Sequence, residues 1–550
     1  MDNRRVFLVA ALAAVLFLIY QAWLQDYGPK PAPEAATPAT ASGPVTAAAP
    51  ALATTPNAAH ASAPATAAAL PQGQEVHVHT DVLDLVLSTA GGDIRRAALL
   101  DYPEELTAKD QPVRVLDDRD ASLLVLQTGL EAGAGAVAPG PDAVYTTQKQ
   151  DYVLADGQDK LEVALSWQYG HGLKVTKTYR FSRGSYEIGL SYEVQNGTPA
   201  PWSGGAYAEW QSRYVPVKNG MFSTTRYDYQ RVGMHGADGY HQFEFSALAT
   251  EPLSQEQDDG WIALVEHYFM AAIIPAAGEK HLYYSKSLGD GRFLTGSATP
   301  SRNVAAGATA SFSDRLFVGP KLQTKLAAVA PGLELTVDYG KLTIIAQPIF
   351  WVLEQIERLI KNWGWSILLL TVLIKAITYK LNEISGRSMA KMRQVQPRIK
   401  AIQERYADDR QRMSQAMMEL YKKEKINPAS GCFPILVQIP IFFALYYVLV
   451  YSVELRQAPW TLWIKDLSAP DPFYVLPVLY GIAMFIQQHL QPQPTDKMQA
   501  RMMKFMPVAL IALYMVLPSG LVLYYFANSI ISIAQQRYIN RLIEKESKKS

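Results

Sequence analysis

Five long apolar runs in the C-terminal two-fifths of the chain constrain its fold more than any other feature. They occupy residues 365–379, 435–453, 473–488, 505–517 and 521–533, and short segments separate most of them. A helix of about 20 apolar residues crosses the hydrocarbon core of a bilayer. A sixth run, residues 6–24, follows Arg4 and Arg5. The chain is therefore predicted to be a membrane protein with about six spans, the first separated from five clustered ones.

The N-terminal run predicts an uncleaved signal anchor over residues 1–28. The run is longer than the apolar region of a cleaved signal peptide, and Tyr20, Trp23 and Tyr27 suit a membrane interface. A removed signal peptide is the alternative. Residues 29–73 are mainly Ala, Pro, Thr, Ser and Gly, which predicts a disordered tether.

Loop charges predict the orientation of the spans. Lys and Arg are concentrated in residues 380–425, in residues 497–504 and in the basic tail 538–550. Positively charged loops stay in the cytoplasm, so both termini are predicted to be cytoplasmic. The loop with Trp460 and Trp463 and the turn at 518–520 are predicted to face outward.

Residues 74–340 show the two-residue period of β-strands. Clear examples are residues 161–167, 173–181 and 186–194, with Gly or Asn between them. The pattern predicts one large antiparallel β-sandwich outside the cytoplasmic membrane. Acidic residues exceed basic ones there by about ten, but the whole chain has 51 Lys and Arg against 50 Asp and Glu. This balance gives no bulk attraction to DNA, and the single cysteine, Cys432, excludes an intrachain disulfide.

The sequence contains no motif that predicts catalysis, a metal site or a cofactor. Residues 133–138 superficially match a dinucleotide-binding pattern, but Pro139 and Pro141 follow where its helix should begin, so a loop is predicted. There is no Walker A sequence. The histidines of the sandwich lack the spacing of a metal pair and are interpreted as structural; they are His171, His235, His241, His267 and His281.

Residues 341–363 predict an amphipathic helix that lies along the outer membrane surface. Its apolar residues repeat at intervals of three and four, and charged residues occupy the other side. A core helix of the sandwich is the alternative. The apolar positions are Ile345, Ile349, Val352, Ile356 and Leu359.

Residues 383–427 predict an antiparallel helical hairpin that projects into the cytoplasm. Apolar residues recur at three and four on either side of Asp408 and Asp409, which suit a turn and a helix cap. The basic surface is interpreted either as a solvated face beside anionic lipid or as a docking site for an RNA-containing partner such as the ribosome.

A series of ordered motifs resembles the YidC membrane-insertase family. They are GCFP at 431–434, QIPIF at 438–442, SVELR at 452–456, DLS at 466–468, FMP at 505–507 and PSGLVLYY at 518–525. The anchor, tether and sandwich resemble the Gram-negative branch, whose periplasmic domain is a β-supersandwich. The resemblance implies a multi-pass inner-membrane insertase and folding chaperone, not an enzyme. Such a protein moves nascent membrane proteins into the bilayer, alone or with the Sec translocon.

The resemblance also implies a five-helix core over 364–537 with a substrate groove that is closed on the outside. It places Lys375, Thr371, Tyr379, Gln438, Tyr524 and Tyr525 in that groove. Asn528 joins them because a polar residue inside a span favours a protected face. Many members have arginine where this chain has Lys375, so the charge is kept and the bidentate fork is lost. Ordinary interhelical contacts, and snorkelling of Lys375 to the headgroups, are the alternatives.

Within this family context the hairpin is expected to capture clients, meaning nascent membrane proteins, or their ribosome. Flexible methionines suit varied apolar partners, and basic side chains suit phosphate. The residues expected to act are Met389, Lys391, Met392, Arg393, Arg398, Lys400, Arg405, Met413 and Met417.

Two other classes of function fit the sequence less well. A solute or ion transporter would need several charged groups at membrane depth, and Lys375 stands alone in its run. A membrane-tethered periplasmic carbohydrate-binding protein or enzyme would leave the C-terminal spans unexplained. The run 505–517 would measure only about 20 Å as a helix, which predicts a locally thinned bilayer unless hydropathy misplaces its ends.

Overall fold

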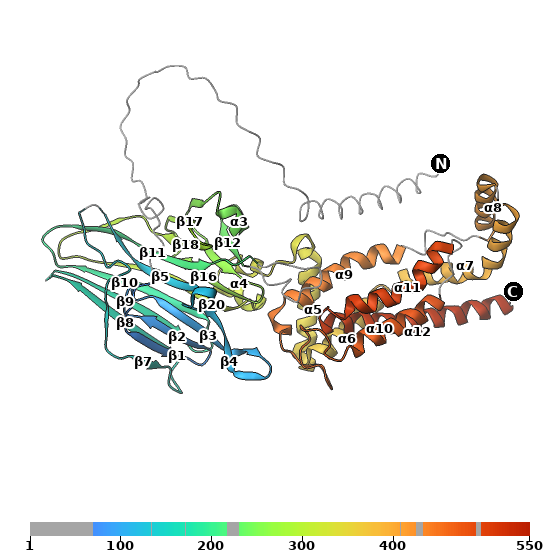
Figure 1. Ribbon diagram of the computed structural model, residues 1–550, viewed down its shortest axis with the longest axis horizontal. Helices are drawn as coiled ribbons and strands as arrows, with labels where there is room; N and C mark the ends of the chain where they lie inside the picture. Colours follow the sequence, from blue (N-terminus) through green and yellow to red (C-terminus); the bar gives the residue numbers. More distant parts are fainter. Residues whose placement is uncertain are drawn as a thin grey trace, which may run out of the picture. The chain divides into compact units, whose positions relative to one another are not determined.

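The computed structural model describes residues 70–133, 135–170, 172–216, 230–407, 409–424, 433–490 and 497–549. The predicted signal anchor and nearly all of the predicted tether lie outside these residues, as do His171, Asp408 and Cys432. The described chain forms a β-sandwich domain followed by a set of helices (Figure 1).

Two sheets make up the β-sandwich domain. The first has the strand order β14-β17-β18-β11-β5-β3-β2-β1-β7, with β19 paired to β11 and β4 paired to β3. Its strands are β1 (Glu75–His79), β2 (Leu83–Ser88), β3 (Ile94–Glu105), β4 (Ala108–Leu116), β5 (Leu124–Ala132), β7 (Asp151–Val153), β11 (Trp202–Arg213), β14 (Leu253–Gln257), β17 (His281–Gly289), β18 (Arg292–Ala298) and β19 (Arg302–Val304).

The second sheet has the order β13-β12-β15-β16-β20-β10-β9-β8-β6. Its strands are β6 (Thr146–Thr147), β8 (Lys160–Tyr169), β9 (Leu173–Ser182), β10 (Glu187–Asn196), β12 (Arg231–Gly236), β13 (Gly239–Glu244), β15 (Trp261–Val265), β16 (Phe269–Pro275) and β20 (Thr309–Pro320). Short helices α3 (Phe245–Leu248) and α4 (Gln323–Val329) complete the domain.

The two-residue period accounts for this sandwich. The three runs singled out in the sequence are β8, β9 and β10, which pair antiparallel, and Ile188 lies opposite Phe181. Alternate side chains of β9, such as Val175 and Tyr179, are fully buried. Most neighbouring strands pair antiparallel, and β1 with β7 is a parallel exception. The predicted antiparallel β-sandwich is therefore confirmed.

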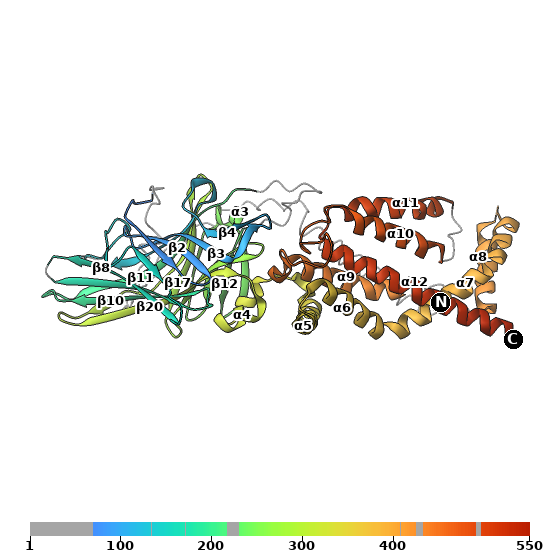
Figure 2. The same cartoon turned by 90° about the horizontal axis from the view of Figure 1, so that it is seen from below.

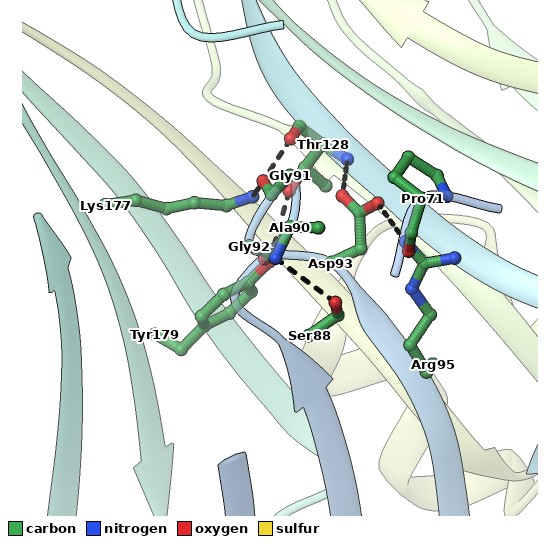
Figure 3. Close-up of polar contacts among 10 residues, drawn as sticks. All are labelled: Pro71, Ser88, Ala90, Gly91, Gly92, Asp93, Arg95, Thr128, Lys177 and Tyr179. Carbon is green, nitrogen blue, oxygen red and sulfur yellow. Dashed lines mark hydrogen bonds and ion pairs between the residues drawn. The ribbon is translucent and has the colours of Figure 1, made fainter. Parts of the chain in front are cut away.

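A buried polar cluster links the two sheets (Figure 3). Lys177 of β9 is fully buried, and its Nζ donates to the carbonyl oxygens of Gly91 and Thr128, each at 2.9 Å. The Tyr179 hydroxyl donates to Gly92 O at 2.7 Å, and Thr128 N donates to Asp93 Oδ1 at 3.1 Å. Burial lowers the pKa of Lys177 and raises that of Asp93. Because these bonds cross the core, they fix the sheets against each other.

The C-terminal part consists of helices, several of which pack against α12. They are α5 (Thr343–Ile360), α6 (Trp363–Ile377), α7 (Tyr379–Arg405), α8 (Arg410–Lys423), α9 (Phe433–Tyr451), α10 (Val475–His489), α11 (Lys497–Tyr514) and α12 (Ser519–Lys549). Helix α12 contacts α6, α7, α9 and α10, and α10 also contacts α11 (Figure 2). The predicted membrane helical bundle is thus confirmed as a fold class.

Helix α5 corresponds to the predicted amphipathic helix. Ala346, Phe350 and Leu353 are its buried residues, and it packs against α6 and α9, whereas the alternative placed it in the core of the sandwich. Leu359 is 87% exposed and Trp351 is 60% exposed. Lys361 ends α5 with a φ of 56°, in the left-handed region typical of a helix end.

Three helix boundaries differ from the predicted runs. The run 365–379 is broken, because α6 ends at Ile377 and α7 starts at Tyr379 after a bend of 68°. The Thr378 hydroxyl donates to Ile374 O at 2.8 Å, a contact that often bends helices. Helix α11 begins at Lys497 and ends at Tyr514, and α12 continues through the segment predicted as a tail.

Among the described residues, no single helix has both the length and the apolar character to cross a membrane, whereas the bent pair α6 and α7 has sufficient length and hydropathy when taken together. The shorter apolar helices are Leu436–Tyr451, Val475–His489 and Phe505–Tyr514. The count of six spans and the division of the chain into domains stay predictions.

Candidate functional site

Lys375 lies in the last turn of α6 and faces α12. Its Nζ donates to Ser532 Oγ at 2.9 Å, and Ser532 Oγ donates in turn to Asn528 O at 2.7 Å. Lys375, Asn528 and Ser532 are all half-buried. The structure therefore brings together two of the predicted groove residues in a short polar chain between otherwise apolar helices.

Thr371 lies one turn before Lys375 and is only 1% exposed. Its Oγ1 donates to Ile367 O at 2.7 Å, within the same helix. Such a bond satisfies the hydroxyl locally, as is usual for threonine in an apolar helix. In this structure Thr371 is therefore a buried neighbour of the Lys375 site.

Gln438 and the two tyrosines form a second group, between α9 and α12. Gln438 Nε2 donates to the Tyr524 hydroxyl at 3.0 Å. Tyr524 and Tyr525 are 1% and 8% exposed, and their rings lie 5.2 Å apart. The Tyr525 ring also contacts Phe442 at 5.1 Å and Tyr514 at 5.2 Å. This group is an aromatic cluster inside the bundle with one polar bond to α9.

Tyr379 is separated from the other predicted groove residues by the bend. It is the first residue of α7 and is 38% exposed. The Gln535 side chain of α12 approaches its carbonyl oxygen at 3.5 Å, the outer limit of a hydrogen bond. Tyr379 thus marks where the helices turn from the bundle toward the hairpin.

Ser532, Phe442 and Tyr514 are site residues that the sequence did not single out. A signal for Ser532 existed, because Tyr525, Asn528 and Ser532 recur at three and four along α12 and so share one helix face. Phe442 and Tyr514 carried no such signal, since they reach the cluster from α9 and α11.

The predicted cytoplasmic hairpin is formed by α7 and α8. Asp409 caps α8, because its Oδ1 accepts from Arg412 N at 3.0 Å. Val395 and Ile399 are buried between the helices. The five basic residues predicted to act, Lys391, Arg393, Arg398, Lys400 and Arg405, are all exposed, and the four methionines, Met389, Met392, Met413 and Met417, are half-buried. Arg398 also pairs with Glu424 at 2.6 Å.

A cavity of about 400 Å³ lies between the two hairpin helices. Apolar and charged side chains line it together; they include Ile402, Arg405, Tyr406, Leu420 and Lys423. At its base the hairpin is held by α12, where Ala390 of α7 packs with Ile539 and Ile543. The hairpin therefore combines an apolar interior with a basic outer surface.

The described histidines of the sandwich have ordinary structural contacts. His267 Nε2 lies 2.8 Å from Val450 O, and His281 Nδ1 lies 3.2 Å from Ser297 Oγ. Burial lowers the pKa of both to about 4, so both are neutral at pH 7. His235 stacks on Trp261. In the described part of the chain, no three His, Cys, Asp or Glu side chains are grouped to hold a metal ion.

Comparison with known families matches nearly all of the described chain. Residues 75–352 match the family described as the YidC periplasmic domain, and residues 355–547 match the family described as the 60Kd inner membrane protein. The junction between the two matches lies within α5.

Full-length relatives carry one name. The chain is 44% identical to the membrane protein insertase YidC of Nitrosococcus oceani, over 99% of this chain and 100% of the relative. It is also 44% identical to the YidC insertase of Methylococcus capsulatus, over 100% and 99%. A crystal structure described as an active YidC insertase aligns over 87% of this chain and 95% of that one, with 20% identity and a TM-score of 0.39. The chain belongs to the YidC membrane protein insertase family.

Proposed function

We propose that this chain inserts nascent membrane proteins into the inner membrane and assists their folding. The main structural support is the pair of consecutive hydrogen bonds from Lys375 to Ser532 and from Ser532 to the Asn528 carbonyl, between α6 and α12. A charged group within an apolar bundle is costly and usually marks a substrate path. The names of the full-length relatives support the same function.

In the proposed mechanism, Lys375 hydrates a groove on the cytoplasmic and lipid side of the bundle. Its ammonium group attracts acidic residues of the client segment that must cross, while the cluster of Tyr524 and Tyr525 guides the apolar segment into lipid. Both rings are buried, and Gln438 Nε2 donates a hydrogen bond to the Tyr524 hydroxyl. Transfer requires no covalent step in this scheme, so the chain acts as an insertase rather than an enzyme.

The hairpin is proposed to meet the client first. Its exposed basic residues suit ribosomal RNA phosphate, and its half-buried methionines can adapt to an apolar client segment. The Sec translocon is proposed as a partner because the sequence resembles the YidC family. Loop charges support a multi-pass topology with both termini in the cytoplasm and the β-sandwich domain in the periplasm.

Substitution at Lys375 tests the proposal. Lys375→Arg is expected to keep insertion, Lys375→Ala to slow it, and Lys375→Glu to slow clients with acidic translocated segments most, by about tenfold. Lys380→Ala is the matched control, since Lys380 is five residues away and its side chain is 87% exposed. Insertion rates are measured with clients whose translocated charge is varied. Equal rates for Lys375→Ala and the unaltered chain on every client would refute the role of the charge.

A further inference from the structure

The segment that follows α9 contacts the β-sandwich domain at several points. Arg456 Nη2 donates to the carbonyl oxygens of Pro103 at 2.9 Å and Glu104 at 3.1 Å. Gln457 Nε2 donates to Pro103 O at 3.0 Å. Pro103 and Glu104 lie at the end of β3, beside the turn into β4. Two neighbouring side chains thus hold the backbone of the β3–β4 hairpin.

Further contacts stabilise this junction. The Arg456 guanidinium lies 5.6 Å from the centre of the Phe269 ring, and Tyr102 of β3 packs on the edge of the same ring. His267 Nε2 caps α9 by contacting Val450 O, one of the carbonyl groups that a helix end leaves without an intrahelical partner. The junction therefore combines a cation over an aromatic ring with hydrogen bonds to backbone carbonyls.

Gln457 has a strained backbone. Its φ is 56°, in the left-handed region that only glycine adopts without cost. Its backbone N donates to Asp466 Oδ1 at 3.0 Å, while its side chain reaches Pro103. Strain of this kind persists only where the surroundings hold it, and it concentrates at functional positions.

The same loop is bonded to the start of α12. Ser519 Oγ donates to Asp466 O at 2.8 Å, and Gly520 N donates to Leu467 O at 2.9 Å. Helix α12 then carries Tyr524, Tyr525 and Asn528. A continuous set of hydrogen bonds therefore leads from the β3–β4 hairpin through Gln457 and Asp466 to the helix of the candidate site.

We propose that Arg456 and Gln457, here called the outer latch, are positioning residues that let the periplasmic domain fix the outer end of α12. The latch acts through the loop that Asp466 organises, so the placement of the tyrosine cluster depends on docking of the β3–β4 hairpin. This inference rests on the proposed function for its consequence in insertion, but the coupling itself is a property of the fold.

Two substitutions separate a latch from a local structural role. Gln457→Gly removes the side-chain contact with Pro103 and relieves the backbone strain, so a purely local role predicts an unchanged or steadier loop. Arg456→Ala removes both of its bonds to the hairpin. Arg180→Ala is the control, because it removes an exposed ion pair with Glu162 elsewhere on the domain.

Amide hydrogen exchange on the full chain in lipid nanodiscs measures the coupling. In the double variant of Arg456→Ala and Gln457→Gly, we expect at least about tenfold faster exchange both in residues 99–113 and at Ser519 and Gly520, with β9 and β10 unchanged. The control alters β9 itself, where Arg180 also donates to Ser191 of β10, but it should leave residues 99–113, Ser519 and Gly520 unchanged. Faster exchange in the hairpin alone, or in neither region, would overturn the proposal.

An insertion assay on the same variants keeps the two proposals distinguishable. If the latch exists and the proposed function holds, the double variant also inserts clients more slowly. If Lys375→Ala inserts normally while the joint exchange response is present, the proposed role of the groove charge fails and the latch stands. If Lys375→Ala is slow but the exchange response is confined to the hairpin, the latch alone fails.

Discussion

Glu454, in the single turn Val453–Leu455 after α9, should make the junction between domain and bundle sensitive to pH. The residue is half-buried, but its Oε2 atom is fully buried and has no hydrogen-bond partner among the described residues. Burial raises its pKa from 4.5 to about 7, and the nearby carboxylate of Glu354 adds to the rise. The folded chain therefore binds this proton more tightly than the unfolded chain does.

The sign and size of the effect follow from linkage. The stabilisation from the bound proton is fully present below pH 4.5 and is lost as pH rises through about 7. The rise in pKa corresponds to at most about 3 kcal/mol. Glu454→Gln keeps the shape of the side chain and cannot ionise. We expect the variant to exceed the local stability of the unaltered chain by no more than about 1 kcal/mol at pH 5 and by up to about 3 kcal/mol at pH 8.

Hydrogen exchange of the turn is the appropriate assay, because the domain and the helices need not unfold together. The amides of Leu455 and Arg456, which bond to Ser452 O and Val453 O, report its opening after correction for the intrinsic effect of pH. Glu162→Gln, at an exposed carboxylate on β8, is the control. A gain from Glu454→Gln that is as large at pH 5 as at pH 8 would show that packing, not ionisation, is responsible, and no gain at either pH would refute the argument outright.

Three further outcomes are expected. Lys177→Met should destabilise the β-sandwich domain by about 3–5 kcal/mol in denaturant unfolding, because two buried carbonyl groups lose their donor and Asp93 keeps only Arg95 of the two cations near it; a loss below about 1 kcal/mol would contradict the cross-sheet role. Deletion of residues 389–425 should abolish insertion while the remaining helices keep their circular dichroism, and normal insertion by the truncated chain would place capture elsewhere. Spin labels along residues 506–518 should report a bilayer thinner than its surroundings, since the apolar part of α11, Phe505–Tyr514, is short; normal thickness there would remove that proposal.

The local periodicity of the sequence predicted the strands and helices well. It did not predict which residues far apart in the chain contact each other. The strands 161–167, 173–181 and 186–194 were predictable because side chains alternate along a half-buried strand, and Asp409 was predictable as a cap because an aspartate before a helical repeat accepts backbone N–H groups. The contact of Lys375 with Ser532 spans 157 positions, and no local pattern encodes it. The bend after Ile377 also escaped prediction, since it occurs at a threonine, without proline or glycine.

In the candidate site, the sequence predicted the charged residue better than it predicted the residues that surround it. Lys375 stood out because it is the only charged residue in its apolar run. Thr371 is bonded to Ile367 within its own helix, and its burial comes from tertiary packing, which the sequence of α6 alone does not reveal. Tyr514 joined the aromatic cluster only through the packing of α11, a tertiary contact with no signature in either helix.

The unbroken course of α12 has a mechanical consequence. The helix contains 31 residues and so measures about 46 Å, about half as long again as the hydrocarbon core of a bilayer. Its first turn is bonded to the loop that contains Leu467 and Ala469, and its far end packs on Ala390 at the base of the hairpin. Because both ends of α12 are held, the helix cannot tilt at one end without moving the other. Under the proposed topology and function, displacement of the tyrosines by a passing client segment would therefore be transmitted along α12 to the base of the hairpin, on the opposite side of the membrane.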